Sequence, residues 1–322
     1  MTPSHTPPPR PRPVLLDTDW FTDVDDVMAL RALLRLQERR FVRLLGVCLN
    51  AVFPESVRSV DAFLLAHGVD VPVAITRRDI QEPSYGPSYQ RRLATLPSKY
   101  QGNEEAAHPV PFYRSLLAGS PEPLHLLSIG FTENLADLLD SPPDSLSPLT
   151  GRELVAQKCA HLWMMAGKWP TGREYNVAGS QGNPRLIAPC AAILQHWPTP
   201  VTFLGFEVGN TVLAGIGLPQ DDLLNIAMEE YHRHPRYALG GANLPPPRHK
   251  THFCWDPLLV LLAAGVVSPE NGGYRAVRGT ASLNPQTGEN DFLPQDNGPH
   301  RYVVKNHPDE EYAQWLEPWL HP

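Results

Sequence analysis

The sequence is poor in the features that mark secreted, membrane and zinc-thiolate proteins. It has only 4 cysteines in 322 residues, far apart and without a CxxC pair, which disfavours a disulfide framework or a cysteine-based metal site. Buried structural thiols are the expected alternative. No apolar run reaches the ~18 residues that a membrane span requires. Residues 1–13 are rich in proline and lack the apolar centre of a signal peptide, so we expect a disordered leader and a cytoplasmic protein.

Positive charge is also scarce. Lys and Arg total 27 against 34 Asp and Glu, which gives a net charge of −7 at pH 7. A nucleic-acid-binding protein needs a basic stripe that complements the phosphate backbone. The composition therefore argues against a nucleic-acid partner and favours a small-molecule ligand.

Short apolar runs alternate along the chain with segments of helical periodicity. The runs lie at residues 13–16, 44–49, 71–75, 124–129, 162–165 and 201–204. Continuous apolar strands that alternate with amphipathic helices are typical of an α/β fold with a mostly parallel central sheet flanked by helices. No internal repeat or linker interrupts the pattern, so we predict a single Rossmann-like domain over residues 14–322.

Ligands of such sheets bind beyond the carboxyl ends of the strands, so the loops that follow the apolar runs are the places to look for chemistry. Two longer segments, residues 76–110 and 231–250, lack clear periodicity. Each is either a lid over the site or an ordinary surface loop, and the sequence does not choose between these.

Residues 17–26 hold five aspartates in ten positions, directly after the first apolar run. Carboxylates this close repel one another unless a cation or hydrogen-bond donors neutralise them. Capping of a helix N-terminus accounts for one or two of the five. The rest favour a divalent cation site, and oxygen ligands without Cys or His predict a hard ion, Ca²⁺ or Mg²⁺.

This segment resembles the signature of the inosine-uridine preferring nucleoside hydrolase family, which reads DTD, a short linker and DDA. Here the pieces are Asp17-Thr18-Asp19, a five-residue linker, and Asp25-Asp26 followed by Val27. Trp20-Phe21 stand where the family commonly has Pro-Gly.

Other segments from about residue 14 to residue 265 extend the resemblance. Residues 130–135 (GFTENL) resemble the family's GPLTN segment, and residues 165–167 (MAG) resemble its MGG. Residues 174–176 (EYN), followed by Gly-Ser, resemble its EFN segment, and residues 255–257 (WDP) stand where the family has HDP or WD.

The resemblance implies a calcium-dependent N-glycosyl hydrolase that releases ribose and a free base. By this likeness Asp19, Asp26 and Asp256 bind Ca²⁺ together with the main-chain carbonyl of Glu133, whose side chain we expect to point outward. Asp19 is also the expected base that takes a proton from the attacking water.

The same likeness implies the residues that bind substrate. Asp25 and Asn50 would hold the ribose 2′- and 3′-hydroxyls, Glu174 and Asn176 would reach its 5′ side, and Met165 would lie against the substrate. Asn50 is equally well explained as a turn residue at a strand end.

Trp255 stands where pyrimidine-tolerant family members have a histidine. Tryptophan here resembles purine-preferring members, in which ring stacking supports the departing base, although a core role for Trp255 is equally compatible with the sequence. His252 is the other candidate acid. Lys168 and Trp169 replace a Gly-Asn element of the family, so a base-modified or 5′-modified riboside is conceivable. A role in purine salvage and a homodimer or homotetramer are further implications.

Two other functions remain open. A HAD-type phosphatase also begins with an apolar strand ending in DxD and would use Asp17 as nucleophile, but it gives no role to Asp25-Asp26 or to Trp255-Asp256. A catalytically silent protein that binds a ribose or nucleoside is the second alternative, motivated by the changes at Trp20-Phe21, Glu133 and Trp255.

Overall fold

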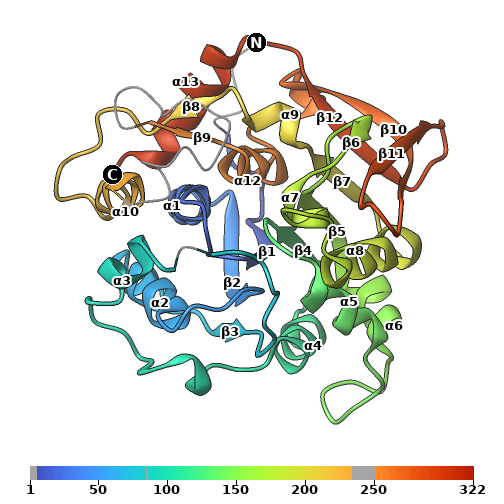
Figure 1. The fold of residues 1–322 in the computed structure, drawn as a ribbon, viewed down its shortest axis with the longest axis horizontal. Helices are drawn as coiled ribbons and strands as arrows, with labels where there is room; N and C mark the ends of the chain where they lie inside the picture. The colour runs from blue at the N-terminus through green and yellow to red at the C-terminus, as the bar shows by residue number, and fades with distance from the viewer. Residues whose placement is uncertain (1–5, 85, 234–250) are drawn as a thin grey trace.

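A computed structural model describes residues 6–84, 86–233 and 251–322. It has three layers, in which one large sheet lies between two layers of helices (Figure 1). This is the predicted mixed α/β class with a mostly parallel central sheet. In the described part of the chain, no helix combines the length and the apolar character that crossing a membrane requires.

The central sheet has ten strands in the described residues, in the order β3-β2-β1-β4-β5-β7-β12-β10-β11-β6. Its strands are β1 (Arg12–Thr18), β2 (Val42–Leu49), β3 (Val73–Ile75), β4 (Leu124–Ser128), β5 (Cys159–Met165), β6 (Thr171–Gly172), β7 (Val201–Leu204), β10 (Tyr274–Leu283), β11 (Asn290–Pro294) and β12 (His300–Lys305). Neighbours from β3 through to β12 pair in parallel, whereas the β12·β10, β10·β11 and β11·β6 pairs are antiparallel. All six apolar runs of the sequence lie in or overlap parallel strands.

One helical layer packs with its apolar side chains against the larger of the two main core clusters. It contains α1 (Asp25–Glu38), α2 (Ser56–Ala66), α3 (Tyr89–Leu93), α10 (Leu223–Arg233), α12 (Asp256–Ala264) and α13 (Asp309–Leu320). The opposite face carries α4 (Pro109–Gly119), α5 (Glu133–Asp140), α6 (Gly151–Lys158) and α8 (Pro184–His196), which enclose the second cluster. Helices therefore cover both faces of the sheet, as the alternating pattern predicts (Figure 1).

The remaining elements are short. They are α7 (Tyr175–Ala178), α9 (Phe206–Gly209), the 3-10 helices η1 (Asn103–Glu105) and η2 (Pro269–Asn271), and the strands β8 (Leu213–Ala214) and β9 (His252–Phe253), which pair with each other. The segment 76–110, predicted as aperiodic, contains α3 and η1. Of the segment 231–250, only residues 231–233 fall within the described residues.

Helix α12 lies in the middle of the first helical layer and is buried along its whole length. A helix that is apolar on every side is expected only in such a position. It begins at Asp256, packs against α1 and the strands β4 and β5, and ends at Gly265, whose φ of 77° is a left-handed conformation that glycine adopts without strain. Its position fixes where Asp256 lies relative to the sheet.

Two predictions from the sequence concern the segment 1–13 and the four cysteines. Strand β1 begins at Arg12, inside the segment predicted as a disordered leader. All four cysteines are buried and free, which confirms the prediction of structural thiols.

The burial of α12 leads to a testable prediction about stability. Leu259→Ala removes a fully buried side chain and should lower the free energy of unfolding by about 2–5 kcal/mol, because it leaves a cavity as well as losing apolar burial. Leu293→Ala is the matched control, since Leu293 is 62 % exposed on β11. Urea unfolding of both variants measures the difference, and equal stabilities would contradict the described packing of α12.

Candidate active site

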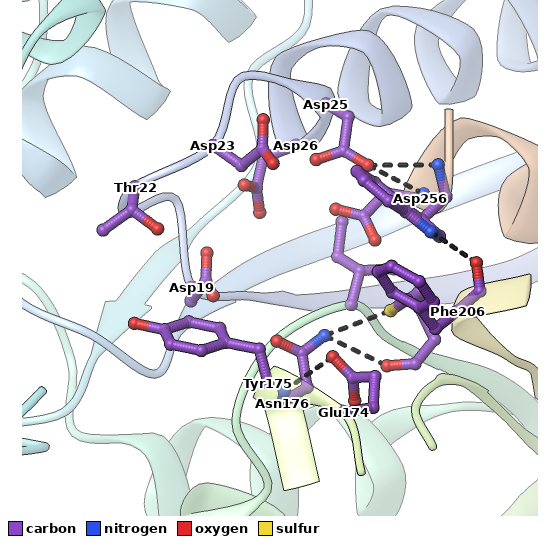
Figure 2. Close-up of a pocket in the computed structure, with 13 residues that line it drawn as sticks. Asp19, Thr22, Asp23, Asp25, Asp26, Glu174, Tyr175, Asn176, Phe206 and Asp256 are labelled. Atoms are coloured by element: carbon purple, nitrogen blue, oxygen red, sulfur yellow. Dashed lines mark hydrogen bonds between the residues drawn. The ribbon is translucent and has the colours of Figure 1, made fainter. Parts of the chain in front are cut away.

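The acidic loop after β1 meets the start of α12 at the carboxyl edge of the sheet. Carboxylate oxygens of Asp25, Asp26 and Asp256 all lie within 4.8 Å of one another. Figure 2 shows these three side chains facing a common space, with Asp19 on its lower side. Groups from distant parts of the chain thus converge on one point. Asp26 and Asp256 of the predicted ligand set belong to this group, whereas Asp19 lines the same cavity outside it.

Hydrogen bonds hold the acidic loop in place. The main-chain N–H groups of Trp255 and Asp256 donate to Asp25 Oδ2 at 3.2 and 3.1 Å, which ties α1 to the start of α12. Asp26 Oδ1 accepts from the Thr18 hydroxyl and, at 3.2 Å, from the Trp20 N–H. Asp25 and Asp26 each present a second oxygen that these bonds leave available.

The departure from the family pattern at Trp20-Phe21 is explained by aromatic packing. Trp20 has a φ of 46°, is fully buried, and donates through Nε1 to the Ser59 hydroxyl at 2.9 Å. Phe21 stacks on Phe53 with ring centroids 4.6 Å apart. Gln90 Nε2 donates to the carbonyls of both residues, at 2.9 and 2.8 Å. The loop is therefore anchored from outside the site instead of by a Pro-Gly turn.

Burial and mutual repulsion dominate the electrostatics. Burial raises the pKa of Asp19, Asp25 and Asp256 well above its ordinary value, and the neighbouring carboxylates raise it further. Burial also raises the pKa of Asp26 to about 7, against hydrogen bonds from Thr18 and Trp20 that lower it. Simultaneous ionisation of all four carboxyl groups is therefore unfavourable without a cation.

The residues present fit a hard divalent cation. The cavity beside the cluster has no lysine, arginine or histidine among its lining residues in the described part of the chain. All the available donors are oxygens, the ligands that Ca²⁺ and Mg²⁺ prefer. A cation would relieve the repulsion that raises these pKa values.

The cavity has a volume of about 260 Å³. Its lining residues are Asp19, Thr22, Asp23, Asp25, Asp26, Ile129, Met165, Glu174, Tyr175, Asn176, Phe206, Trp255 and Asp256. They come from β1's loop, the ends of β4, β5 and β7, α7 and the start of α12, so the cavity lies where an open parallel sheet is expected to bind ligand.

Opposite the acidic loop, Glu174 and Asn176 line the cavity, as predicted. Glu174 accepts from the N–H of Asn176 at 2.8 Å and from that of Gly167 at 3.1 Å. Asn176 Nδ2 donates to the Met165 carbonyl at 3.1 Å. Burial raises the pKa of Glu174 to about 7, although these N–H groups lower it. Figure 2 shows both side chains across the cavity from the aspartates.

An aromatic wall closes one side of the cavity. Trp255 stacks on Phe206 with centroids 5.6 Å apart and an interplanar angle of 27°, and its Nε1 donates to the Phe206 carbonyl at 2.8 Å. Trp255 is 9 % exposed and lines the cavity, so it is a wall residue and not simply part of the core.

Asn50 does not line the cavity. Its side chain is fully buried, with Nδ2 donating to Asp17 at 2.6 Å and Oδ1 accepting from the Phe131 N–H at 2.9 Å. Both ends of the amide are thus occupied beneath the site, and the predicted ribose contact of Asn50 stays a prediction. Asp17 is also fully buried and outside the cavity, hydrogen-bonded by Tyr113, which counts against the phosphatase alternative that needs it as nucleophile.

Two further predicted residues lie behind the cavity wall. The Glu133 side chain is 6 % exposed and does not line the cavity, which agrees with an orientation away from the acidic cluster, and one of its carboxyl oxygens is buried without a partner in the described part of the chain. His252 is 2 % exposed, and its Nε2 lies 2.5 Å from Asp23 Oδ1. Asp23 lines the cavity and separates His252 from it.

Four lining residues of the cavity were not predicted from the sequence: Thr22, Ile129, Tyr175 and Phe206. Phe206 follows the last residue of β7 by two positions and Ile129 follows β4 by one. The rule that ligands bind beyond the carboxyl ends of strands could have identified both.

No protein-family model matches the sequence, and no curated protein matches it. Solved structures do match its fold. The type III effector protein XopQ, complexed with adenosine diphosphate ribose, has a TM-score of 0.63 and 20% identity over 98% of this chain and 95% of that chain. The Inosine-Guanosine Nucleoside Hydrolase has a TM-score of 0.63 and 14% identity over 96% and 98% of the two chains.

A third match is the inosine-uridine preferring nucleoside hydrolase from Bacillus anthracis, with a TM-score of 0.60 and 17% identity over 96% of this chain and 99% of that chain. These likenesses extend over nearly the whole of each chain. Taken with the mostly parallel sheet and the cavity at its carboxyl edge, they show that the chain has the nucleoside hydrolase fold.

Proposed function

We propose that the protein hydrolyses the N-glycosidic bond of a ribonucleoside, with a purine-type or modified base favoured, in a calcium-dependent reaction. The observation that carries this proposal is the convergence of Asp25, Asp26 and Asp256 on one cavity. The cavity also holds the Glu174 and Asn176 pair and an aromatic wall. Nucleoside hydrolases among its structural neighbours support the same reaction class.

The cation would be held by Asp19, Asp26 and Asp256 with the main-chain carbonyl of Glu133. When bound, it would lower the pKa of a water molecule and engage the sugar's vicinal hydroxyls. Asp26 and Asp19 lie close enough that the charge of Asp26 raises the pKa of Asp19. Asp25 lies beside them and binds the main-chain N–H groups of the α12 start.

Asp19 is the proposed base that accepts the proton of the attacking water. It lines the cavity, and the Phe21 N–H donates to its Oδ1 at 3.2 Å, which orients the carboxylate. Cleavage of the glycosidic bond develops positive charge on the sugar, as in other glycoside hydrolysis. The surrounding carboxylates stabilise that charge because they are fixed before the reaction starts.

The sugar would lie between the acidic loop and the Glu174 and Asn176 pair. Asp25 would accept hydrogen bonds from the 2′- and 3′-hydroxyls, and Glu174 and Asn176 would face the other end of the ribose. Met165 lines the cavity between them. Since Asn50 is occupied by Asp17 and Phe131, we assign it to positioning the residue-131 loop.

The base would pack against the wall formed by Trp255 and Phe206. A stacked pair of this size offers a broad apolar face that suits a purine-type ring. Stacking lowers the cost of expelling the base and takes the place of a histidine acid. His252 stays a candidate proton source only through Asp23, because Asp23 lies between it and the cavity.

A second candidate function is binding of a ribosyl ligand without hydrolysis. The structural match to XopQ complexed with adenosine diphosphate ribose favours it, as does Trp255 at the position of the acid. The assay that follows separates the two functions.

Hydrolysis of p-nitrophenyl riboside provides the first test, because this leaving group needs no acid. Wild-type protein should release p-nitrophenol, and Asp19→Asn should reduce kcat by ~100-fold or more because the general base is lost. Asp221→Asn, which removes an exposed carboxylate elsewhere, should keep wild-type activity. Release by neither wild type nor variant supports binding alone, and equal release by both overturns the role of Asp19.

Metal removal tests the cation site. A chelator should abolish hydrolysis, and Ca²⁺ should restore it. Calorimetry should show saturable Ca²⁺ binding that Asp256→Asn weakens by ~10-fold or more, because a buried oxygen ligand loses its charge. If Mg²⁺ but not Ca²⁺ restores hydrolysis, the proposed ion is wrong. If the Asp256→Asn variant binds Ca²⁺ as tightly as the wild type, the proposed ligand set is wrong.

The pH dependence of stability follows from the buried carboxyls. The pKa of Glu174 is raised from 4.5 to about 7, and that of Asp17 from 3.8 to about 7. The folded protein therefore binds more protons than the unfolded chain between these values, and its stability falls as pH rises through that range. We expect the metal-free protein to melt at a lower temperature near about pH 8 than near about pH 5.5.

Glu174→Gln is the control for this measurement, since glutamine removes the titration and keeps the size. Its melting temperature should change less with pH than that of the wild type. Added Ca²⁺ should raise the melting temperature more at the higher pH, where the carboxylates are ionised. A melting temperature that rises with pH in the metal-free protein would contradict the described burial.

A further inference from the structure

A second cavity lies at the opposite, amino edge of the sheet. Its volume is about 560 Å³, and Arg12, His125, Trp163, Glu270 and Arg301 are among its lining residues. Arg12 is the first residue of β1, whereas the acidic loop of the candidate active site follows the last residue of that strand. The two cavities are thus separated by the length of the strand.

The strand register explains why polar residues gather there. His125 pairs with Val14 of β1 on one side and with His161 of β5 on the other, and Thr202 of β7 pairs with both Trp163 and Arg301. Since side chains alternate between the faces of a strand, these residues project on the face that α12 covers. The C-terminal end of α12, at Leu262 and Gly265, completes the cavity.

Most N–H donors of the Arg12 and Arg301 guanidiniums have no acceptor among the described residues. Of the five N–H groups of a guanidinium, Arg12 uses one on the Ala263 carbonyl at 2.5 Å. Arg301 uses Nε on the Thr202 hydroxyl at 2.6 Å, and its Nη1 is 3.6 Å from Glu270. No other hydrogen bond to either guanidinium occurs within residues 6–84, 86–233 and 251–322.

His125 adds a neutral donor. Trp163 Nε1 can only donate, and it lies 3.0 Å from His125 Nδ1, so the imidazole proton is on Nε2. Burial lowers the pKa of His125 to about 4, and Arg12 lowers it further. The ring is therefore neutral at pH 7 and offers an N–H to the cavity, because no described residue accepts from Nε2.

Acceptors are few by comparison. Both polar atoms of the Asn271 side chain are already hydrogen-bonded. Its Nδ2 donates to the Val266 carbonyl at 2.8 Å, and its Oδ1 accepts from the main-chain N–H groups of Ser268 and Gly273. Glu270 is the one carboxylate of the lining, and its side chain is 68 % exposed. The cavity lining thus has two guanidiniums and an imidazole N–H as donors, and one solvent-exposed carboxylate as their charged acceptor.

We propose that this cavity binds a small phosphate-bearing anion. Guanidinium groups pair with phosphate oxygens through two parallel hydrogen bonds, and phosphate carries more charge than a carboxylate such as Glu270. The anion takes the place of Glu270 beside Arg301. A cavity of about 560 Å³ is far larger than the ~30 Å³ that one water occupies, so it has room for the organic part of a phosphate monoester.

Calorimetry of the metal-free full-length protein at constant ionic strength tests the proposal, with inorganic phosphate and ribose 5-phosphate as probes. Both should bind saturably, and a tighter monoester identifies an ester as the preferred form, whereas equal affinities identify free phosphate. Arg301→Gln should weaken binding by ~10-fold or more because a bidentate contact is lost. Glu270→Gln should tighten it several-fold, because the competing carboxylate is removed.

The controls separate this site from folding effects and from the candidate active site. Arg152→Gln removes an exposed guanidinium on α6 and should leave affinity unchanged. Asp19→Asn should also bind phosphate normally, so failure of the proposed hydrolase leaves this proposal standing. Arg12→Gln removes a hydrogen bond to the Ala263 carbonyl of α12. If that loss prevents the variant from folding, the Arg301→Gln and Glu270→Gln variants still test the proposal. Absence of saturable binding at millimolar phosphate, or affinities that neither of these two variants changes, would overturn it.

Discussion

The mutual repulsion of buried carboxylates is the constraint on which the rest of this structure depends. Asp19, Asp25, Asp26 and Asp256 are buried together, and burial and mutual repulsion raise the pKa of each, so the fold opposes their ionisation. An arrangement that opposes ionisation this strongly needs a compensating charge to act at neutral pH. The described residues that line the cavity include no basic side chain, so a bound cation is the compensation that the proposed function requires.

The frame that holds these charges together is apolar and rigid. Helix α12 is buried along its whole length, so it cannot shift without exposing its side chains to water. Asp25 binds the N–H groups at its start, while Trp20 and Phe21 pack into aromatic contacts with Tyr89 and Phe53. Aromatic burial therefore holds the acidic loop in place at the position of Trp20 and Phe21.

Strands that follow from burial and site residues that follow from a motif could be predicted from the sequence. The direction in which an individual side chain packs could not. The buried parallel strands are apolar throughout, so β7 was predicted with its observed ends, whereas β10 is half exposed, carries Arg275 and Arg278, and has no apolar run. The convergence of Asp26 with Asp256 followed from the family resemblance. The orientation of Asn50 did not, because a position at a strand end does not reveal that both its amide atoms are bonded beneath the site.

The two edges of one sheet face carry opposite charge, and this polarity separates the kinds of ligand each edge can accept. The carboxyl edge holds a cluster of aspartates, whose oxygens suit a cation. The amino edge holds Arg12 and Arg301 with neutral imidazoles. Helix α12 reaches from Asp256 at the first to Gly265 at the second. The proposed anion therefore suits the basic edge, where Arg12 and Arg301 supply the guanidinium donors.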